Sequence, residues 1–235
     1  MNIISHPSAN HEPRPQGASI DMLVLHYTGM ETPEAALQRL CDPESKVSAH
    51  YFIEEDGTIR QLVEDSERAW HAGVSYWQGR ENLNHYSIGV EIVNPGHEFG
   101  YRDFPAVQMQ AVRDLCLHLI KTHKIPQYNV VAHSDIAPDR KEDPGEKFDW
   151  KFLAREGVGI WPAAYDVTQM PDMRVAMTAL TTIGYKVGTN LDNILAIKAF
   201  QRRYRPELID GSLDHHTYGR ILELAEIVTA HKGVK

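Results

Sequence analysis

The sequence predicts an α/β fold in which a mixed central sheet is flanked by helices, followed by a small all-α domain of three helices. Short apolar runs and longer helical patterns alternate in the order β-α-β-β-β-α-β as far as Trp161-Pro162. Beyond that point only helical spacing continues. We therefore expect a domain over 1–162 that begins with an extended arm over 1–20, a linker over 163–172, and a three-helix domain over 173–235.

Composition limits the classes of partner. The chain has 235 residues with 42% hydrophobic residues, enough for one large domain or a large and a small one. A formal net charge of −8 argues against nucleic acid or an anionic membrane as the main partner. No stretch approaches the ~20 apolar residues of a membrane span. We expect a monomer.

Two features suggest a compartment. The first residues lack a basic region followed by an apolar core, so no export signal is predicted. The two cysteines, Cys41 and Cys116, cannot form a disulfide scaffold and fit a reducing compartment. The expected location is the cytoplasm, or the periplasm and cell envelope if residue 1 is not the native start.

The first strand and helix are well marked. Residues 22–28, MLVLHYT, run almost unbroken in apolar character, as in a strand covered on both faces, and His26 comes where a polar turn begins. Thr32 is a suitable cap and Pro33 a suitable first residue for a helix that ends near Asp42-Pro43. This helix is expected to follow the strand directly.

A hairpin and a buried strand come next. Residues 50–53 and 58–63 are β-type runs separated by Glu55-Asp56-Gly57, which suits a tight turn. In the later run 87–93, alternate residues put Gly89 and Glu91 on one face and apolar side chains on the other. A carboxylate there is costly unless it is paired or used, so Glu91 is either a structural ion pair or a general base.

The clearest helix follows Phe104-Pro105. One apolar stripe is expected to pack on the sheet, and it comprises Val107, Ala111, Val112, Leu115, Cys116, Leu119 and Ile120. Ile125-Pro126 ends the helix. A short strand over 129–132 then leads to His133.

Three residues form a candidate zinc site. His26 and His133 each follow an apolar strand, and Asp143 lies in a loop long enough to fold back on His133. Imidazole nitrogens and a carboxylate oxygen suit zinc, and three protein ligands leave a fourth position for water. Because the chain has 13 histidines, His50 is a rival ligand, which we rank below Asp143. The expected site is a surface zinc groove at one end of the sheet.

Five motifs carry a family resemblance over Met22 to Trp161: LHYTG (25–29), SAHYFIEEDGTI (48–59), RAWHAGVS (68–75), SIGVEIVNPG (87–96) and AHSDIAPDRKEDPG (132–145). In this order they resemble the zinc-dependent N-acetylmuramoyl-L-alanine amidases, in particular the group with the anhydromuropeptide amidases. The resemblance implies the same zinc ligands, His26, His133 and Asp143, and a catalytic Glu91. It also implies hydrolysis of the amide between N-acetylmuramic acid, or its 1,6-anhydro form, and L-alanine of peptidoglycan stem peptides, in cell-wall recycling or remodelling.

The ligand set leads to a mechanism and to its alternatives. Glu91 would take a proton from water and return it to the departing amine, while Lys141, two residues before a ligand, would stabilise an oxyanion. A non-catalytic peptidoglycan receptor with a structural zinc is the alternative function, but such relatives typically lack part of the metal set. A Cys/His hydrolase using Cys41 is weaker, since no context activates that thiol.

Substrate contacts are expected from several residues. Trp70 and His71 either pack in the core or line a groove for sugar and peptide. Arg80 and Asn84 are candidates for polar substrate groups, and Arg140 for a carboxylate or a sugar oxygen. The same role is assigned to Tyr27, to Asn94 and to His50 as a substrate-facing residue.

The C-terminal segment contains three helical patterns. Leu180, Gly184-Tyr185, AFQRRY (199–204) and Asp210-Gly211 resemble a peptidoglycan-binding three-helix domain. Such a bundle would either hold a glycan strand or only brace the first domain. The expected partner is peptidoglycan or a muropeptide.

Overall fold

The computed structural model describes residues 1–163 and 170–233. Most of the predicted linker, 164–169, and the last two residues lie outside the described part. The strands are β1 (Ile3–Ser5), β2 (His11–Pro13), β3 (Met22–Tyr27), β4 (Tyr51–Ile53), β5 (Ile59–Gln61), β6 (Glu67–Ala69), β7 (Tyr76–Trp77), β8 (Arg80–Glu81), β9 (Ser87–Ile92) and β10 (Val130–Ala132). The helices are α1 (Pro33–Cys41), α2 (Gly96–Phe99), α3 (Ala106–His123), α4 (His133–Ile136), α5 (Trp150–Arg155), α6 (Met173–Ile183), α7 (Asn190–Tyr204) and α8 (His215–Gly233).

The central sheet is mixed, as predicted. Its six strands lie in the order β1-β5-β4-β9-β3-β10. β4, β9, β3 and β10 run parallel, and β5 pairs antiparallel with β4 in the predicted hairpin. The register of β3 on β9 places His26 opposite Glu91, so these side chains share one face near the carboxyl ends of their strands.

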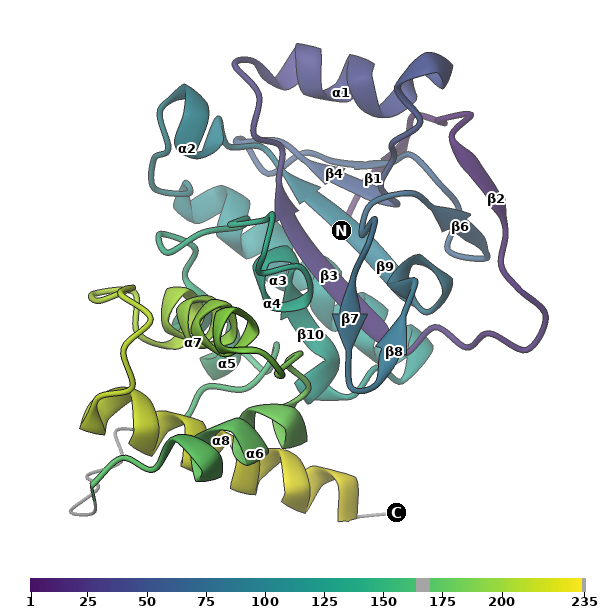
Figure 1. The fold of residues 1–235 in the computed structure, drawn as a ribbon. Coiled ribbons are helices and arrows are strands. Elements are labelled where there is room, and N and C mark those ends of the chain that lie inside the picture. The colour runs from purple at the N-terminus through teal and green to yellow at the C-terminus, as the bar shows by residue number, and fades with distance from the viewer. Residues whose placement is uncertain (164–169, 234–235) are drawn as a thin grey trace.

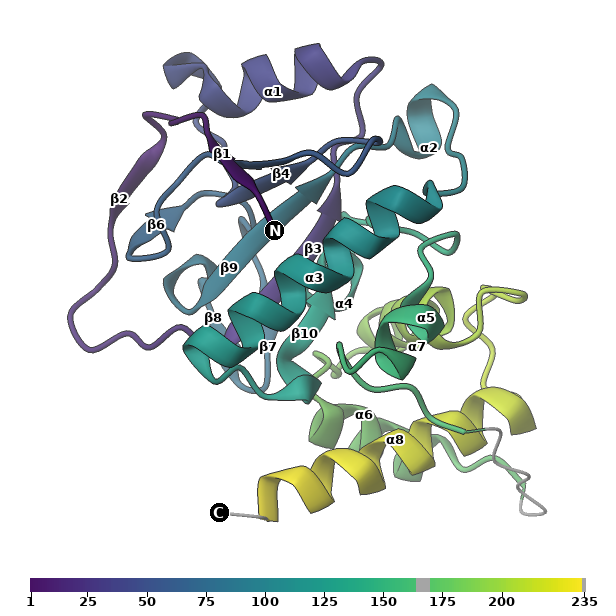
Figure 2. The same ribbon diagram turned by 180° about the vertical axis from the view of Figure 1, so that it is seen from behind.

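Helices cover both faces of the sheet (Figures 1 and 2). Leu23 and Leu25 of β3 belong to an apolar cluster with α3, which runs along the face seen in Figure 2. Met22 and Val24 point the other way, into a cluster with α6, α7 and α8. The unbroken apolar run of β3 thus has the predicted cause, burial on both faces.

The predicted helix boundaries are largely confirmed. The Thr32 hydroxyl caps α1 by accepting from the Ala35 amide, and Pro33 is its first residue. The α3 stripe was wrong at one position, because Val107 is 48% exposed. Gln108 is buried instead, since its amide donates to the carbonyl of Ile53, the last residue of β4, and to that of Val93, which directly follows β9. A polar side chain therefore takes this buried position because the backbone carbonyls at the strand ends need hydrogen-bond donors.

The N-terminal arm contains more regular structure than we expected. β1 adds to the sheet edge by pairing parallel with β5, and β2 pairs antiparallel with β6. Arg14 fastens the arm by donating to the carbonyls of Asp65, Asn84 and Ser87. These strands are mostly exposed and are held by backbone hydrogen bonds. Their residues therefore do not alternate between apolar and polar, and the sequence did not predict them.

The segment after the linker folds into the helices α6, α7 and α8, and their core continues into the sheet. Tyr185 and Phe200 share one apolar cluster with Met22 and Val24 of β3. The Tyr185 ring lies edge-on to Trp77, with 5.0 Å between ring centroids. Within the described residues, no helix is long and apolar enough to cross a membrane.

Candidate metal centre

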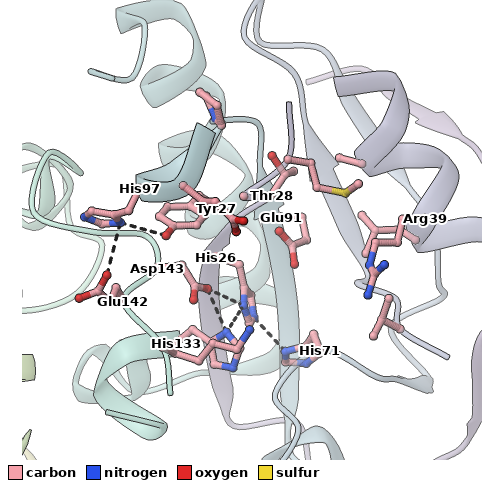
Figure 3. Close-up of a pocket in the computed structure, with 18 of the residues that line it drawn as sticks. His26, Tyr27, Thr28, Arg39, His71, Glu91, His97, His133, Glu142 and Asp143 are labelled. Atoms are coloured by element: carbon pink, nitrogen blue, oxygen red, sulfur yellow. Dashed lines mark hydrogen bonds and ion pairs between the residues drawn. The ribbon is translucent and has the colours of Figure 1, made fainter. Parts of the chain in front are cut away.

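His26, His133 and Asp143 converge on one point, and we call these three residues the metal triad. The Nδ1 atoms of the two histidines are 2.9 Å apart. Asp143 Oδ2 lies 3.1 Å from His26 Nδ1 and 2.9 Å from His133 Nδ1. All three side chains are at most 7% exposed, and Figure 3 shows them pointing toward each other.

Local folding of the 133–143 loop brings the last ligand back to the second. His133 opens the short helix α4 directly after β10. The amide of Ser134 donates to the carbonyl of Asp143 at 2.9 Å, and the amide of Lys141 donates to that of Ala137 at 3.0 Å. The two ends of the loop are thereby fixed side by side, as the sequence suggested.

The outer nitrogens of both histidines are held by hydrogen bonds. His133 Nε2–H donates to the carbonyl of Ala72 at 3.3 Å, and His26 Nε2–H donates to His71 Nδ1 at 3.1 Å. His71 in turn donates from Nε2 to the Ser87 hydroxyl, which donates to the carbonyl of Leu83. This chain assigns the tautomers and leaves an Nδ1 lone pair of each ligand histidine facing the triad centre.

The protonation states fit a cation at that centre. Burial and the neighbouring His133 lower the pKa of His26 to about 4, so its ring is neutral at pH 7. Burial acts to raise the pKa of Asp143, but positive charge and hydrogen-bond donation at the two Nδ1 atoms outweigh it and hold the pKa well below its ordinary value, so a positive charge at this point keeps the carboxylate ionised. Two lone pairs and an ionised carboxylate this close repel each other unless a cation joins them. The donor set, two nitrogens and one oxygen, suits zinc.

Glu91 lies beside the triad on the same sheet face (Figure 3). Its Oε2 is buried and has no hydrogen-bond partner within the described residues, and no ion pair involves it there. Burial, with a smaller contribution from the charge of Asp143, raises the pKa of Glu91 well above its ordinary value. A carboxyl group with an unused oxygen and a raised pKa is suited to proton transfer and not to a structural ion pair.

A cavity of about 440 Å³ lies over the triad, and we call it the triad cavity. Of the predicted residues, Tyr27, Trp70, His71, Glu91, Arg140 and Lys141 line it together with the three ligands. Arg140 is already engaged, because its guanidinium donates to the carbonyls of Ala72 and Val74. Lys141 Nζ has no partner within the part of the chain that the structure describes. Lys141 is therefore the freer of the two cations.

Four other predicted contacts do not line the triad cavity. His50 is fully buried and accepts from the Gly89 amide, Arg80 pairs with Asp21, and Asn84 accepts from the amides of His71 and Ala72. Asn94 is buried and donates to the carbonyl of Arg102. Three of the four, His50, Asn84 and Asn94, are thus buried and hydrogen-bonded inside the protein, whereas Arg80 lies near the start of β3, at the other end of that strand from His26.

Sequence reasoning missed several residues of the cavity, chiefly His97, Arg39, Glu98 and Glu142. His97, from the short helix α2, contacts the Tyr27 hydroxyl at 3.0 Å and Glu146 at 3.0 Å. Arg39 comes from α1 (Figure 3). These side chains sit in loops and on a helix surface with no strand-end pattern, so only a folded chain reveals them.

Gly89 to Ala is expected to destabilise the protein, because a Cβ at this position would lie 2.3 Å from the buried His71 ring. We expect a loss of about 1–3 kcal/mol in the free energy of unfolding. Thermal unfolding of the metal-free protein checks this. Gly233 to Ala is the control, since a Cβ there meets nothing within 4 Å. Equal melting temperatures for the Gly89 variant and the wild type would refute the close packing.

Because His50 is buried in the neutral form, we expect the fold to lose stability in acid. Burial and the nearby Arg14 lower its pKa from 6.5 to about 3. Above pH 6.5 it is neutral in both the folded and the unfolded state, while below that value the unfolded chain takes up the proton first. Protonation of His50 in the unfolded chain therefore lowers the free energy of unfolding as the pH falls below 6.5, and the loss reaches roughly 3 kcal/mol near pH 4.

Urea unfolding of the metal-free protein across this range measures that loss. His50 to Asn keeps an acceptor for the Gly89 amide but does not titrate, so its stability should fall less steeply with acid. An identical slope for the wild type and this variant would show that His50 does not contribute.

The chain is similar to known amidases. The family described as N-acetylmuramoyl-L-alanine amidase matches residues 16–146. The amidase AmiD of Escherichia coli is 37% identical over 84% of this chain and 79% of its own length. The 1,6-anhydro-N-acetylmuramyl-L-alanine amidase AmpD of the same organism is 37% identical over 61% of this chain and 86% of its own.

Solved structures extend the likeness to the C-terminal helices. AmiD in complex with anhydro-N-acetylmuramic acid-L-Ala-D-γ-Glu-L-Lys superposes with a TM-score of 0.81 at 36% identity, covering 91% of this chain and 92% of that one. AmpDh3 of Pseudomonas aeruginosa, in complex with an anhydromuramic pentapeptide, gives 0.82 at 31% identity, covering 94% and 98%. On this evidence, the chain belongs to the N-acetylmuramoyl-L-alanine amidase family.

Proposed function

We propose that this protein is a zinc-dependent hydrolase that cleaves the amide bond between N-acetylmuramic acid, or its 1,6-anhydro form, and L-alanine of peptidoglycan stem peptides. The observation that carries the proposal is the convergence of three buried ligand atoms beside Glu91 at the floor of the triad cavity, which we take to be the predicted surface groove. The complexes of AmiD and AmpDh3 with anhydromuropeptides support this substrate class.

His26, His133 and Asp143 would hold the zinc ion. When bound, zinc lowers the pKa of a coordinated water to about 7 and polarises the carbonyl of the amide. The hydrogen bonds from His26 to His71 and from His133 to Ala72 keep both rings in the orientation that ligation needs.

Glu91 would move the proton. Its raised pKa brings the carboxyl nearer the working pH, where a group can both accept and return a proton. The free Oε2 is the atom available for this exchange. Glu91 would take a proton from water and deliver it to the nitrogen of the departing L-alanine, which could not leave as an anion.

Lys141 would stabilise the negative charge that develops on the carbonyl oxygen. It lies in the triad cavity, and its backbone bond to Ala137 fixes the loop two residues before Asp143. A cation beside the carbonyl oxygen favours the transition state, in which that oxygen is negative, over the ground state. Arg140, held by two backbone carbonyls, would instead shape the cavity wall.

Purified peptidoglycan and an anhydromuropeptide, incubated separately with the zinc-loaded protein, test this function. We expect free stem peptides that disappear with a chelator and return with zinc. The faster substrate would distinguish recycling of wall fragments from remodelling of the wall. Retained binding without cleavage would favour the alternative, a non-catalytic receptor with a structural zinc. Against it stands Glu91, whose buried Oε2 has no partner among the residues that the structure describes.

The wall-binding role of the C-terminal helices stays a prediction. Of the side chains that carry the resemblance, Tyr185, Phe200, Gln201 and Tyr204 are all at most 4% exposed, whereas Asp210 is exposed. Any glycan contact would have to come from other residues of the bundle, and sedimentation of the intact protein with insoluble peptidoglycan would test it. The cytoplasmic location and the monomeric state also stay predictions, for cell fractionation and light scattering respectively.

A further inference from the structure

The turn that carries His133 is fastened by the C-terminal helices. Asp135 of α4 is buried, and its Oδ2 accepts from the amide of Ala132. The same carboxylate accepts two bonds from distant residues: the Tyr185 hydroxyl at 2.6 Å and Arg203 Nη1 at 2.7 Å. Its position therefore depends on side chains that follow the linker in sequence.

Arg203 of α7 connects Asp135 to two other segments of the fold. It is 4% exposed, and besides Asp135 it donates from Nη2 to the carbonyl of Val130 at 2.9 Å. Its guanidinium also stacks 3.9 Å from the centre of the Trp150 ring. Arg203 thus binds both the strand β10 and the turn after it, the two segments on either side of His133.

The preceding arginine reaches the other end of the same loop. Arg202 donates to Glu142 Oε1 at 2.8 Å, and Glu142 immediately precedes the ligand Asp143. Because Glu142 is 54% exposed, this pair contributes little. The buried Arg203–Asp135 pair is shielded from solvent, so removing one partner leaves an uncompensated charge.

We propose that Arg203 is a positioning residue for the metal triad, acting through Asp135 on His133. The AFQRRY segment would then serve the metal site of the amidase fold. This inference rests on the proposed function, since it assumes that the triad binds zinc. Outer groups that orient a ligand typically change metal affinity by about 10–100-fold when removed.

The test compares Arg203 to Gln with Arg205 to Gln in the full chain. Arg205 is a matched control, because it is also buried and pairs with an aspartate, Asp214, but only inside the C-terminal segment. Zinc dissociation constants come from competition with a chromogenic chelator, and melting temperatures from the metal-free proteins. We expect both variants to melt earlier, but only Arg203 to Gln to bind zinc about 10–100-fold more weakly.

Two further variants keep the test decisive if Arg203 to Gln does not fold. Tyr185 to Phe removes one bond to Asp135 and should weaken zinc binding several-fold, while Arg203 to Lys should restore part of the affinity. Wild-type zinc affinity in the Arg203 or Tyr185 variants would overturn the inference, as would an equal loss in Arg205 to Gln. Absence of zinc binding by the wild type would instead count against the proposed function.

Discussion

Replacing Glu91 with glutamine is expected to lower the rate of amide hydrolysis by about 10²–10⁴-fold while zinc remains bound. Glutamine has nearly the same shape but can neither accept the proton of water nor return one to the amine. It also removes a buried carboxyl whose ionisation is costly, since burial raises the pKa of Glu91. The metal-free variant should therefore be at least as stable as the wild type at pH 7, because glutamine fills the same space without a buried group that is costly to ionise.

Steady-state hydrolysis of an anhydromuropeptide, with zinc content from atomic absorption, measures this. Glu54 to Gln is the control, since Glu54 directly follows β4, pairs with Arg60 and does not line the triad cavity. A Glu91 variant that retains the wild-type rate would remove Glu91 from the mechanism. Loss of zinc together with activity would assign it a role in metal binding.

Replacing Asp143 with alanine should abolish stable zinc binding and lower hydrolysis by about 10³-fold or more, since the metal supplies several kcal/mol of transition-state stabilisation. Asp143 Oδ2 is the oxygen that contacts both ligand histidines. Without it, two neutral imidazoles form an incomplete site. Asp139 to Ala is the control, an exposed aspartate of the same loop.

The same experiment decides between Asp143 and its rival. Zinc content is measured in Asp143 to Ala and in His50 to Ala. Full zinc in the first with none in the second would make His50 a ligand. The structure argues against that outcome, because His50 Nδ1 accepts from the Gly89 amide and the ring lies behind the cavity wall.

The catalytic half of the fold could be predicted because its strands are short apolar runs that end in polar residues. His26 and His133 both follow such runs, and parallel neighbours bring their ends together. Glu91 was recognisable as a carboxylate on the other face from Ile88 and Val90. The sequence pattern predicts these strands correctly because a strand buried on both faces has an almost unbroken run of apolar residues.

Other features leave no such signal. The edge strands β1 and β2 depend on backbone pairing, and Gln108 is buried to satisfy two carbonyls of distant strands. The three C-terminal helices were recognisable, but their common core with β3 and the pair between Arg203 and Asp135 join residues far apart in sequence. Such contacts follow from tertiary packing and not from spacing along the chain.

Mass spectrometry of the products formed in water enriched in heavy oxygen shows which bond the zinc-loaded protein cleaves. The zinc-loaded protein is incubated with an anhydromuropeptide, and the position of the label is read from the fragments. We expect heavy oxygen in the lactyl carboxylate of the sugar and an unlabelled peptide that begins with a free L-alanine amine. Label in the carboxylate of L-alanine, or no cleavage by the zinc-loaded protein, would contradict it.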